Sequence, residues 1–556
     1  MKPTWPEPMA GAAILAGLLL TLILAAGCSI PHPPCDLPQV VYPAGMRLHG
    51  GPLRMGVTDA SRNFPFDLPT ALRRTQAELA VIDDVRWGHI EPEPPQAGQH
   101  AYQWDDERAA LDTRVRTYQQ AGFELIMVLR AWNTWARVAA PAGGMAAAAA
   151  STPPRPETLA DYAAWVQAVV ERYDADGQDD FPGLVDVDGD GHPDPVRLYQ
   201  IEAESATGAW WQGQEAATAT ADYIALLRTA AAAVRAADPT ARILAAGAPA
   251  LDLLDDFPAA AELEDIVTNI NPEVCGGLLA LAHVLAADDA YDLVAMHSLA
   301  NYTGLAVLAD WTATLAGRPV EVWITGAASA PALTGDPQEL RVHPLFPTTG
   351  EGLWSSLANN ADPQHQTVES WYRAEQARLG FKKWVFAAAN GFGALALGLE
   401  QDRPTLEPAG LGQRDLAFQG LLENVGDGPP GSRPVVPALA LAQAQLGGYT
   451  GVQPLAGLGA GIYAFAFRVE RQTVYALWYD DGIAQEPGAP EPTAVVHLPV
   501  RAPQLTMLTI PTRRDQSGPQ VDILTPVDGK ITLALTETPV IIRGEWQAIF
   551  LPRLPS

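Results

Sequence analysis

Two glutamates directly after a short apolar run are well placed for acid–base chemistry. Glu202 and Glu204 follow residues 196–201 (VRLYQI), a run that favours a β-strand. Because side chains alternate along a strand, both carboxylates are expected on one side, with Ala203 on the other. If the strand belongs to a closed parallel barrel, this end of it is where catalytic groups lie. A strand that continues into an acidic surface loop is the alternative.

An aspartate- and glycine-rich loop at 186–194 (DVDGDGHPD) has the pattern of a calcium site. Carboxylates at loop positions one, three, five and nine, with glycine at position six, match the start of an EF-hand-type loop. Arg197 stands at position twelve, where an acid normally completes the coordination, and a second aspartate–glycine stretch at 174–180 offers further oxygens. A solvated acidic turn is the alternative. The expected calcium ligands are Asp186, Asp188, Asp190, Asp194 and the carbonyl oxygen of His192.

Alternating strand and helix patterns surround both segments. Eight strand–helix units in succession predict a parallel (β/α)8 barrel of the TIM type. Beyond residue 447, short alternating strands separated by Pro and Gly turns predict a C-terminal antiparallel β-sandwich. The expected barrel strands lie at 53–57, 85–90, 125–129, 196–201, 242–246, 292–297, 320–325 and 384–388, with helices at 70–82, 105–121, 159–173 and 216–237 and sandwich strands at 461–469, 473–479, 494–500, 505–510, 521–524 and 531–543.

The start of the chain predicts export and attachment to a membrane. Residues 9–26 form an uncharged apolar run behind Lys2, and Cys28 follows directly after Ala-Ala-Gly. This arrangement resembles a bacterial lipoprotein signal, which implies that Cys28 carries the lipid. An uncleaved membrane-spanning anchor is the alternative. The expected organisation is a signal peptide at 1–28, a tether at 29–50, a barrel at 51–446 and a β-sandwich at 447–556.

Composition excludes some classes of partner. The 556 residues are 48% apolar and 18% charged, which suits a packed globular core. The formal net charge of −29 argues against nucleic acid and anionic lipid headgroups as partners, because a basic surface is missing. Three cysteines are too few for a disulfide framework, and a bond between Cys35 and Cys275 is left open.

Several segments resemble motifs of the clan A glycoside hydrolases. Residues 199–205 (YQIEAES) are similar to the Tyr-Gln-Ile-Glu-Asn-Glu-Pro segment at the end of the fourth barrel strand, and Glu204 stands at the place of the general acid/base. Residues 87–93 (WGHIEPE), with YQW at 102–104, resemble a signature that follows strand two. Residues 291–297 (YDLVAMH) resemble strand six, which in the family often ends in an active-site histidine.

The resemblance implies a cleft that faces a carbohydrate. For the tryptophans, packing at the top of the barrel is the alternative to sugar contact, and packing is favoured for Trp87. Sugar contact is favoured for Trp210 and Trp211, because they lie in the loop after Glu204. The residues expected to bind substrate are Trp87, Glu91, Trp132, Trp210, Trp211, His297 and Tyr302.

Two departures from the family pattern affect the chemistry. Residues 323–325 (WIT) resemble strand seven, where the family continues with a nucleophilic Glu, but Gly326 follows here. Ala203 replaces an Asn that hydrogen-bonds the sugar 2-hydroxyl in the family. A retaining glycosidase needs two carboxyl groups about 5–5.5 Å apart, and glycine supplies none. We therefore expect a carbohydrate-facing protein that is impaired or non-catalytic. The alternatives are an active hydrolase completed by Glu202 or Glu400, and a calcium-stiffened surface scaffold.

Overall fold

The structure is a computed structural model, and part of the expected site falls outside the residues that it describes. Glu204, Trp210 and Trp211 lie outside them, as do Cys28 and the rest of the expected signal peptide. None of the described helices is long and apolar enough to cross a membrane. The described residues are 48, 51–59, 68–106, 109–137, 153–203, 216–247, 272–334, 345–346, 348–402, 417–423 and 430–544.

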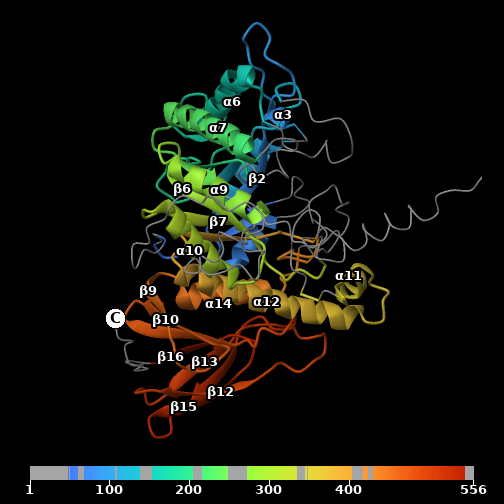
Figure 1. The fold of residues 1–556 in the computed structure, drawn as a ribbon, viewed down its shortest axis with the longest axis vertical. Coiled ribbons are helices and arrows are strands. Elements are labelled where there is room, and N and C mark those ends of the chain that lie inside the picture. Colours follow the sequence, from blue (N-terminus) through green and yellow to red (C-terminus); the bar gives the residue numbers. More distant parts are fainter. Residues whose placement is uncertain are drawn as a thin grey trace, which may run out of the picture.

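Eight parallel strands close into a barrel in the order in which they occur in the chain (Figure 1). They are β1 (Arg54–Asp59), β2 (Leu79–Arg86), β3 (Glu124–Arg130), β4 (Leu198–Ile201), β5 (Arg242–Ala246), β6 (Leu293–Ser298), β7 (Val322–Ala328) and β8 (Ala394–Gly398). The barrel is closed because β1 pairs with both β2 and β8. Closure brings the carboxyl ends of all eight strands to one mouth.

Two apolar layers hold the barrel together. Alternate strand residues such as Leu79, Val81 and Leu198 fill the inside of the barrel, and the residues between them, such as Ala80 and Ile82, pack outward against helices. The helices are α2 (Leu68–Leu72), η1 (Arg73–Thr75), α3 (Trp87–Ile90), α4 (Leu111–Gln120), η2 (Pro156–Thr158), α6 (Leu159–Tyr173), α7 (Ala216–Ala237), α9 (Pro272–Ala286), α10 (Gly304–Ala316), α11 (Gly350–Ala358), α12 (His365–Ala389) and α14 (Val435–Leu446).

The C-terminal part is an antiparallel β-sandwich that meets the barrel at α12 and α14 (Figure 1). A six-stranded sheet has the order β14-β13-β16-β11-β10-β9, and β12 pairs with β15 in a second sheet. The strand expected at 531–543 is two strands, because the chain bends at Glu537 and Thr538 between them. The strands are β9 (Tyr449–Pro454), which the sequence analysis missed, β10 (Ile462–Val469), β11 (Gln472–Tyr479), β12 (Ala494–Pro499), β13 (Leu505–Thr509), β14 (Gln520–Leu524), β15 (Lys530–Leu535) and β16 (Val540–Gly544).

The fold class is confirmed, but the position expected for the second strand is wrong. The helix expected at 70–82 ends early, where Gln76 adopts a left-handed conformation with φ of 62°. The fully buried residues 79–82 then begin β2, and residues 87–90, expected to be strand, form α3. A short apolar run has no periodicity that separates a buried strand from a buried helix.

The eighth strand was also misplaced, for the same physical reason. Residues 384–388 belong to the last turns of α12, and the strand is β8. Every residue from 380 to 388 is buried, because this end of the helix is covered on all sides. A helix without a solvent-facing side shows no amphipathic period, so its sequence resembles a central strand.

Candidate functional site at the barrel mouth

Glu202 lies at the end of β4 but does not follow the expected alternation. Its backbone is left-handed, with φ of 62°, and the strand ends one residue before it. Ala203 instead joins the inner apolar cluster of the barrel. The expectation that Glu202 and Glu204 share one face, with Ala203 opposite, rests on continued strand geometry, and the left-handed residue interrupts that geometry.

The Glu202 carboxylate is used inside the protein. It is only 5% exposed, and its Oε1 accepts a hydrogen bond of 2.7 Å from the backbone N–H of Ala131. Burial raises the pKa of Glu202 above its ordinary value, against the lowering effects of that N–H and of Arg130 and Arg86. Glu202 therefore joins the end of β4 to the segment after β3, which makes it a support of the mouth.

Two arginines that the sequence analysis did not single out act on this carboxylate through their charge. Arg86 is the last residue of β2 and Arg130 is the last residue of β3. Arg130 is fixed by Asp83, because its Nε donates to the Asp83 carbonyl at 2.7 Å and its Nη2 to Oδ1 at 2.8 Å. The sequence could have indicated both arginines, because each is a charged residue that ends an apolar run, and such a run leads to the mouth of a barrel.

His297 and Gly326 lie side by side at the mouth, as expected. They are paired in the register of β6 and β7, next to an irregularity that leaves Thr325 unpaired in this ladder. A Cβ atom added to Gly326 would lie 2.9 Å from Cδ2 and 3.1 Å from Nε2 of His297. A carbon contact of 2.9 Å is too short for a packed protein, so a side chain at position 326 would require the imidazole of His297 to shift.

Trp87 and Glu91 lie beneath the mouth, so the substrate contacts expected for them do not fit the structure. Both are fully buried, and Trp87 Nε1 donates to Glu91 Oε2 at 2.8 Å. His100 Nδ1 lies 2.7 Å from the other carboxylate oxygen, and Asn133 Nδ2 donates to the Glu91 carbonyl at 2.9 Å. Trp87 begins the short helix α3 and Glu91 directly follows it, and together they support the segment that contains Asn133.

Trp132 remains available to a ligand. It is partly exposed just after β3, and its ring meets the ring of His89 edge-on, with centroids 5.7 Å apart. The guanidinium groups of Arg86 and Arg137 each lie 5.8 Å from the Trp132 ring. A sugar ring can stack on a partly exposed indole, and its hydroxyl oxygens can accept hydrogen bonds from guanidinium groups beside it.

Tyr302 lies away from the mouth, at the boundary with the β-sandwich. Its hydroxyl donates to Asp480 Oδ2 at 2.6 Å and accepts from Trp478 Nε1 at 3.4 Å. The ring packs edge-on against Phe386 and Tyr463. Tyr302 is thus a packing residue between the two domains, and the contact with substrate expected at the mouth is not supported.

Known structures share this architecture, although no family model and no curated protein matches the sequence. A family 39 glycoside hydrolase from the gut symbiont Bacteroides cellulosilyticus WH2 matches with a TM-score of 0.54 and 15% identity, over 89% of this chain and 81% of that one. A family 39 enzyme from Xanthomonas axonopodis pv. citri gives 0.50 and 13%, over 89% and 95%. The fold is that of the clan A glycoside hydrolases. At these identities the likeness is one of fold alone.

In this barrel the calcium-like loop lies between α6 and β4. Asp186 accepts hydrogen bonds from the N–H groups of Gly189 at 2.6 Å and Gly191 at 2.9 Å. Asp194 Oδ2 accepts from Asp188 N at 3.1 Å, and both glycines have positive φ, which permits the tight winding. Oxygens of Asp186, Asp188 and Asp194 lie within 4.8 Å of one another, whereas Asp190 and His192 are outside this group.

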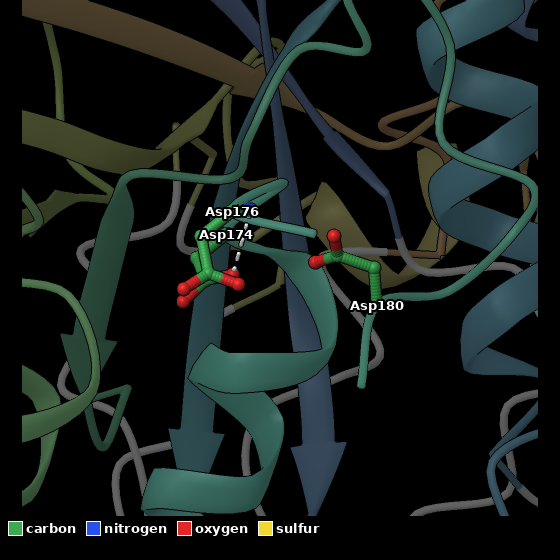
Figure 2. A group of neighbouring side chains, drawn as sticks. All are labelled: Asp174, Asp176 and Asp180. Atoms are coloured by element: carbon green, nitrogen blue, oxygen red, sulfur yellow. Dashed lines mark hydrogen bonds between the residues drawn. The ribbon is translucent and has the colours of Figure 1, made fainter. Parts of the chain in front are cut away.

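The upstream aspartates form a group of their own. Oxygens of Asp174, Asp176 and Asp180 lie within 4.8 Å of one another, and Figure 2 shows the Asp180 carboxylate facing the other two. Burial and the neighbouring carboxylates raise the pKa of Asp174 to about 7. Three carboxylates this close repel one another when ionised, so the group favours either a proton or a cation.

Proposed function

We propose that this chain is an exported carbohydrate-binding protein built on a clan A glycoside hydrolase barrel, with retaining hydrolysis impaired or lost. The observation that carries the proposal is the contact between His297 and Gly326. The resemblance places the family's nucleophilic carboxylate at position 326, where this chain has no side chain and where the His297 ring fills the neighbouring space. Retaining hydrolysis needs a second carboxyl group about 5–5.5 Å from the first.

The described carboxylate nearest to the expected acid/base does not supply the missing group. Glu202 is buried and bonded to the Ala131 N–H. Trp132 and His297 are partly exposed near the ends of β3 and β6, where a sugar can be bound without being cleaved. These positions support binding as the retained activity.

An active hydrolase with an unusual second carboxylate is the alternative, and one observation favours it. Glu400 follows β8, the strand next to β7 in the barrel, and its side chain is buried at 3% exposure. A carboxyl group there would complete an inverting pair if it stood about 6.5–9.5 Å from Glu204. This reading assigns Glu204 as general acid and Glu400 as general base.

Hydrolysis by the wild-type protein distinguishes the carbohydrate-binding protein from the active hydrolase. On aryl β-glycosides and oligosaccharides we expect no hydrolysis above background, together with calorimetric binding of an oligosaccharide that Trp132→Ala weakens. Glu470→Gln, an exposed change in the β-sandwich, is the matched control and should bind normally. Hydrolysis that disappears in both Glu204→Gln and Glu400→Gln would instead establish the active enzyme.

Calcium is proposed as a structural ion of the loop at 186–194. Three carboxylates of this loop converge on one region, and the two glycines give the loop its tight turn. The ligands proposed are Asp186, Asp188 and Asp194, with Asp190 and the His192 carbonyl joining them when the ion binds. An ion there would brace the loop that leads directly into β4 and the mouth.

Export through a lipoprotein signal with lipid on Cys28 is proposed on two grounds. The apolar run at 9–26 ends at Cys28, as described above. In addition, Cys275 in α9 is disulfide-bonded, a point that the sequence left open. Disulfides persist mainly in oxidising compartments, which is consistent with a protein that has left the cytoplasm. Mass spectrometry of the mature N-terminus tests the lipid directly.

A further inference from the structure

A cavity of about 290 Å³ lies between the barrel and the β-sandwich. The segments after β6 and β7 form one wall, and α12 forms another. The β-sandwich closes it with the segment after β11 and with the turn between β15 and β16. Its polar lining comprises Asn301, Tyr302, Glu375, Arg378, Lys382, Asp480, Gln485 and Glu537.

The cationic side chains of this cavity are already paired. Lys382 Nζ donates to Asp480 Oδ2 at 3.0 Å, and the same oxygen accepts from Tyr302. Although burial opposes it, Lys382 and Tyr302 hold the pKa of Asp480 below its ordinary value. Arg378 forms ion pairs with Glu375 and with another glutamate in the segment before β12. Neither cation is therefore free to neutralise a further carboxylate.

Glu537 is a buried carboxylate that the surrounding protein does not neutralise. It lies in the turn between β15 and β16, is only 7% exposed, and lines the cavity. Within the described part of the chain, no donor hydrogen-bonds its carboxylate. A carboxyl group in such a place is stabilised by a hydrogen-bond donor or a cation, and the cavity that Glu537 lines has room for one.

Two more carboxylates point to what that occupant is. Oxygens of Asp480, Asp481 and Glu537 lie within 4.8 Å of one another. Asp481 accepts a hydrogen bond from Ile483 N at 2.9 Å and forms no ion pair with any described residue. The charged side chains that line the cavity are the three carboxylates of Glu375, Asp480 and Glu537 and the two cations of Arg378 and Lys382. Asp481 adds a further carboxylate beside Asp480 and Glu537.

We propose that Asp480, Asp481 and Glu537 bind a divalent cation of the calcium type in this cavity. All three ligands are carboxylate oxygens, which hard divalent cations prefer. An ion there would neutralise Asp481 and Glu537, the two carboxylates of the group that form no ion pair with a described residue. Asp480 also binds Lys382 and Tyr302, so the ion would be coupled to the barrel through Asp480. The site is built by the β-sandwich and is separate from the aspartate loops before β4.

The experiment removes the other candidate sites first. In the full-length chain with Asp174→Asn and Asp188→Asn, calorimetric titration with calcium chloride, and separately with magnesium chloride, should detect one remaining binding equivalent. Glu537→Gln or Asp481→Asn in that background should abolish it or weaken it at least tenfold. Asp481 is exposed, so its variant folds even if the buried one does not. Glu470→Gln, an exposed glutamate in a β-turn of the same domain, is the control that should bind normally.

The melting temperature measured without metal gives a second readout. A glutamate that binds a cation and a merely structural glutamate predict changes of opposite sign in it. In EDTA, Glu537→Gln should raise the melting temperature, because it removes an unpaired buried charge, while the rise that calcium produces should be lost. A merely structural glutamate would lower the melting temperature when replaced. The proposal is wrong if the loop-deficient background binds no cation, or if binding persists unchanged in both Glu537→Gln and Asp481→Asn.

Discussion

At the mouth of the barrel, single atoms decide which chemistry fits. The ring of His297 lies where a side chain at position 326 would have to stand. The carboxylate of Glu202 is turned into the protein by one left-handed residue. Both features concern which way one side chain points, and neither follows from the alternation that predicted the surrounding strands.

The contact between His297 and Gly326 can be measured by a double-mutant cycle. Gly326→Ala should lower the free energy of unfolding by about 1–3 kcal/mol, the usual effect of overpacking. In a His297→Ala background the same change should have almost no effect, because the ring that collides with the new Cβ is gone. Urea unfolding of the four proteins gives the coupling energy. An equal effect of Gly326→Ala in both backgrounds would show that the ring is not the obstacle.

At the scale of elements, the sequence predicted those parts of the fold that one regular period describes. The amphipathic helix α6 and strands such as β5 were placed correctly, because each has one buried face or a short bounded run. β2 and β8 were misplaced, because fully buried segments carry no period. The pairing of His297 with Gly326 followed from the barrel. The inward turn of Glu202 and the location of Tyr302 depend on tertiary contacts that no local pattern contains.

The aspartate loop before β4 should respond to calcium as one element. Calcium that binds only the folded chain raises the melting temperature by mass action. Asp188→Ala should remove most of the increase in melting temperature that this loop contributes. Asp522→Ala, in an edge strand of the β-sandwich, should leave that increase intact. Differential scanning calorimetry with calcium and with EDTA measures both. An identical calcium response in wild type and Asp188→Ala would reduce the loop to an acidic turn.

The neighbouring group at 174–180 predicts a pH dependence. The pKa of Asp174 is about 7 in the folded protein against an ordinary value of 3.8. Between these pH values the folded chain keeps a proton that the unfolded chain has lost, so the contribution of Asp174 to stability falls as pH rises toward 7. Urea unfolding in EDTA should show this slope reduced in Asp174→Asn. In the wild type, calcium should reverse this dependence of stability on pH, because the ion takes the place of the proton.

At the scale of the whole molecule, the barrel and the β-sandwich share one core. Phe386 of α12 packs against Phe465 and Trp478 of the β-sandwich, with ring centroids 5.3 and 6.1 Å apart. These residues belong to the same apolar cluster as the outer faces of the barrel strands. The composition and the change of pattern near residue 447 predicted two domains, but they gave no measure of how strongly the two are joined.

This shared core predicts that the protein unfolds as one unit. Trp478→Ala should lower the free energy of unfolding by about 3–5 kcal/mol, typical for a large buried aromatic side chain, and should shift a single calorimetric transition as a whole. Val495→Ala, at a residue 62% exposed on β12, is the control and should have little effect. A second transition at the wild-type temperature would mean that the barrel unfolds independently.

One hydrogen bond links the start of the barrel to the start of the β-sandwich. The backbone N–H of Leu53, just before β1, donates at 3.1 Å to the hydroxyl of Tyr449, the first residue of β9. During synthesis, Leu53 leaves the ribosome almost four hundred residues before its partner does. The apolar side of α12 is likewise left without its cover until the final domain has appeared. A secretion system that keeps the polypeptide extended until its end has crossed the membrane would suit this order of events, because premature collapse would leave those aromatic surfaces open to aggregation.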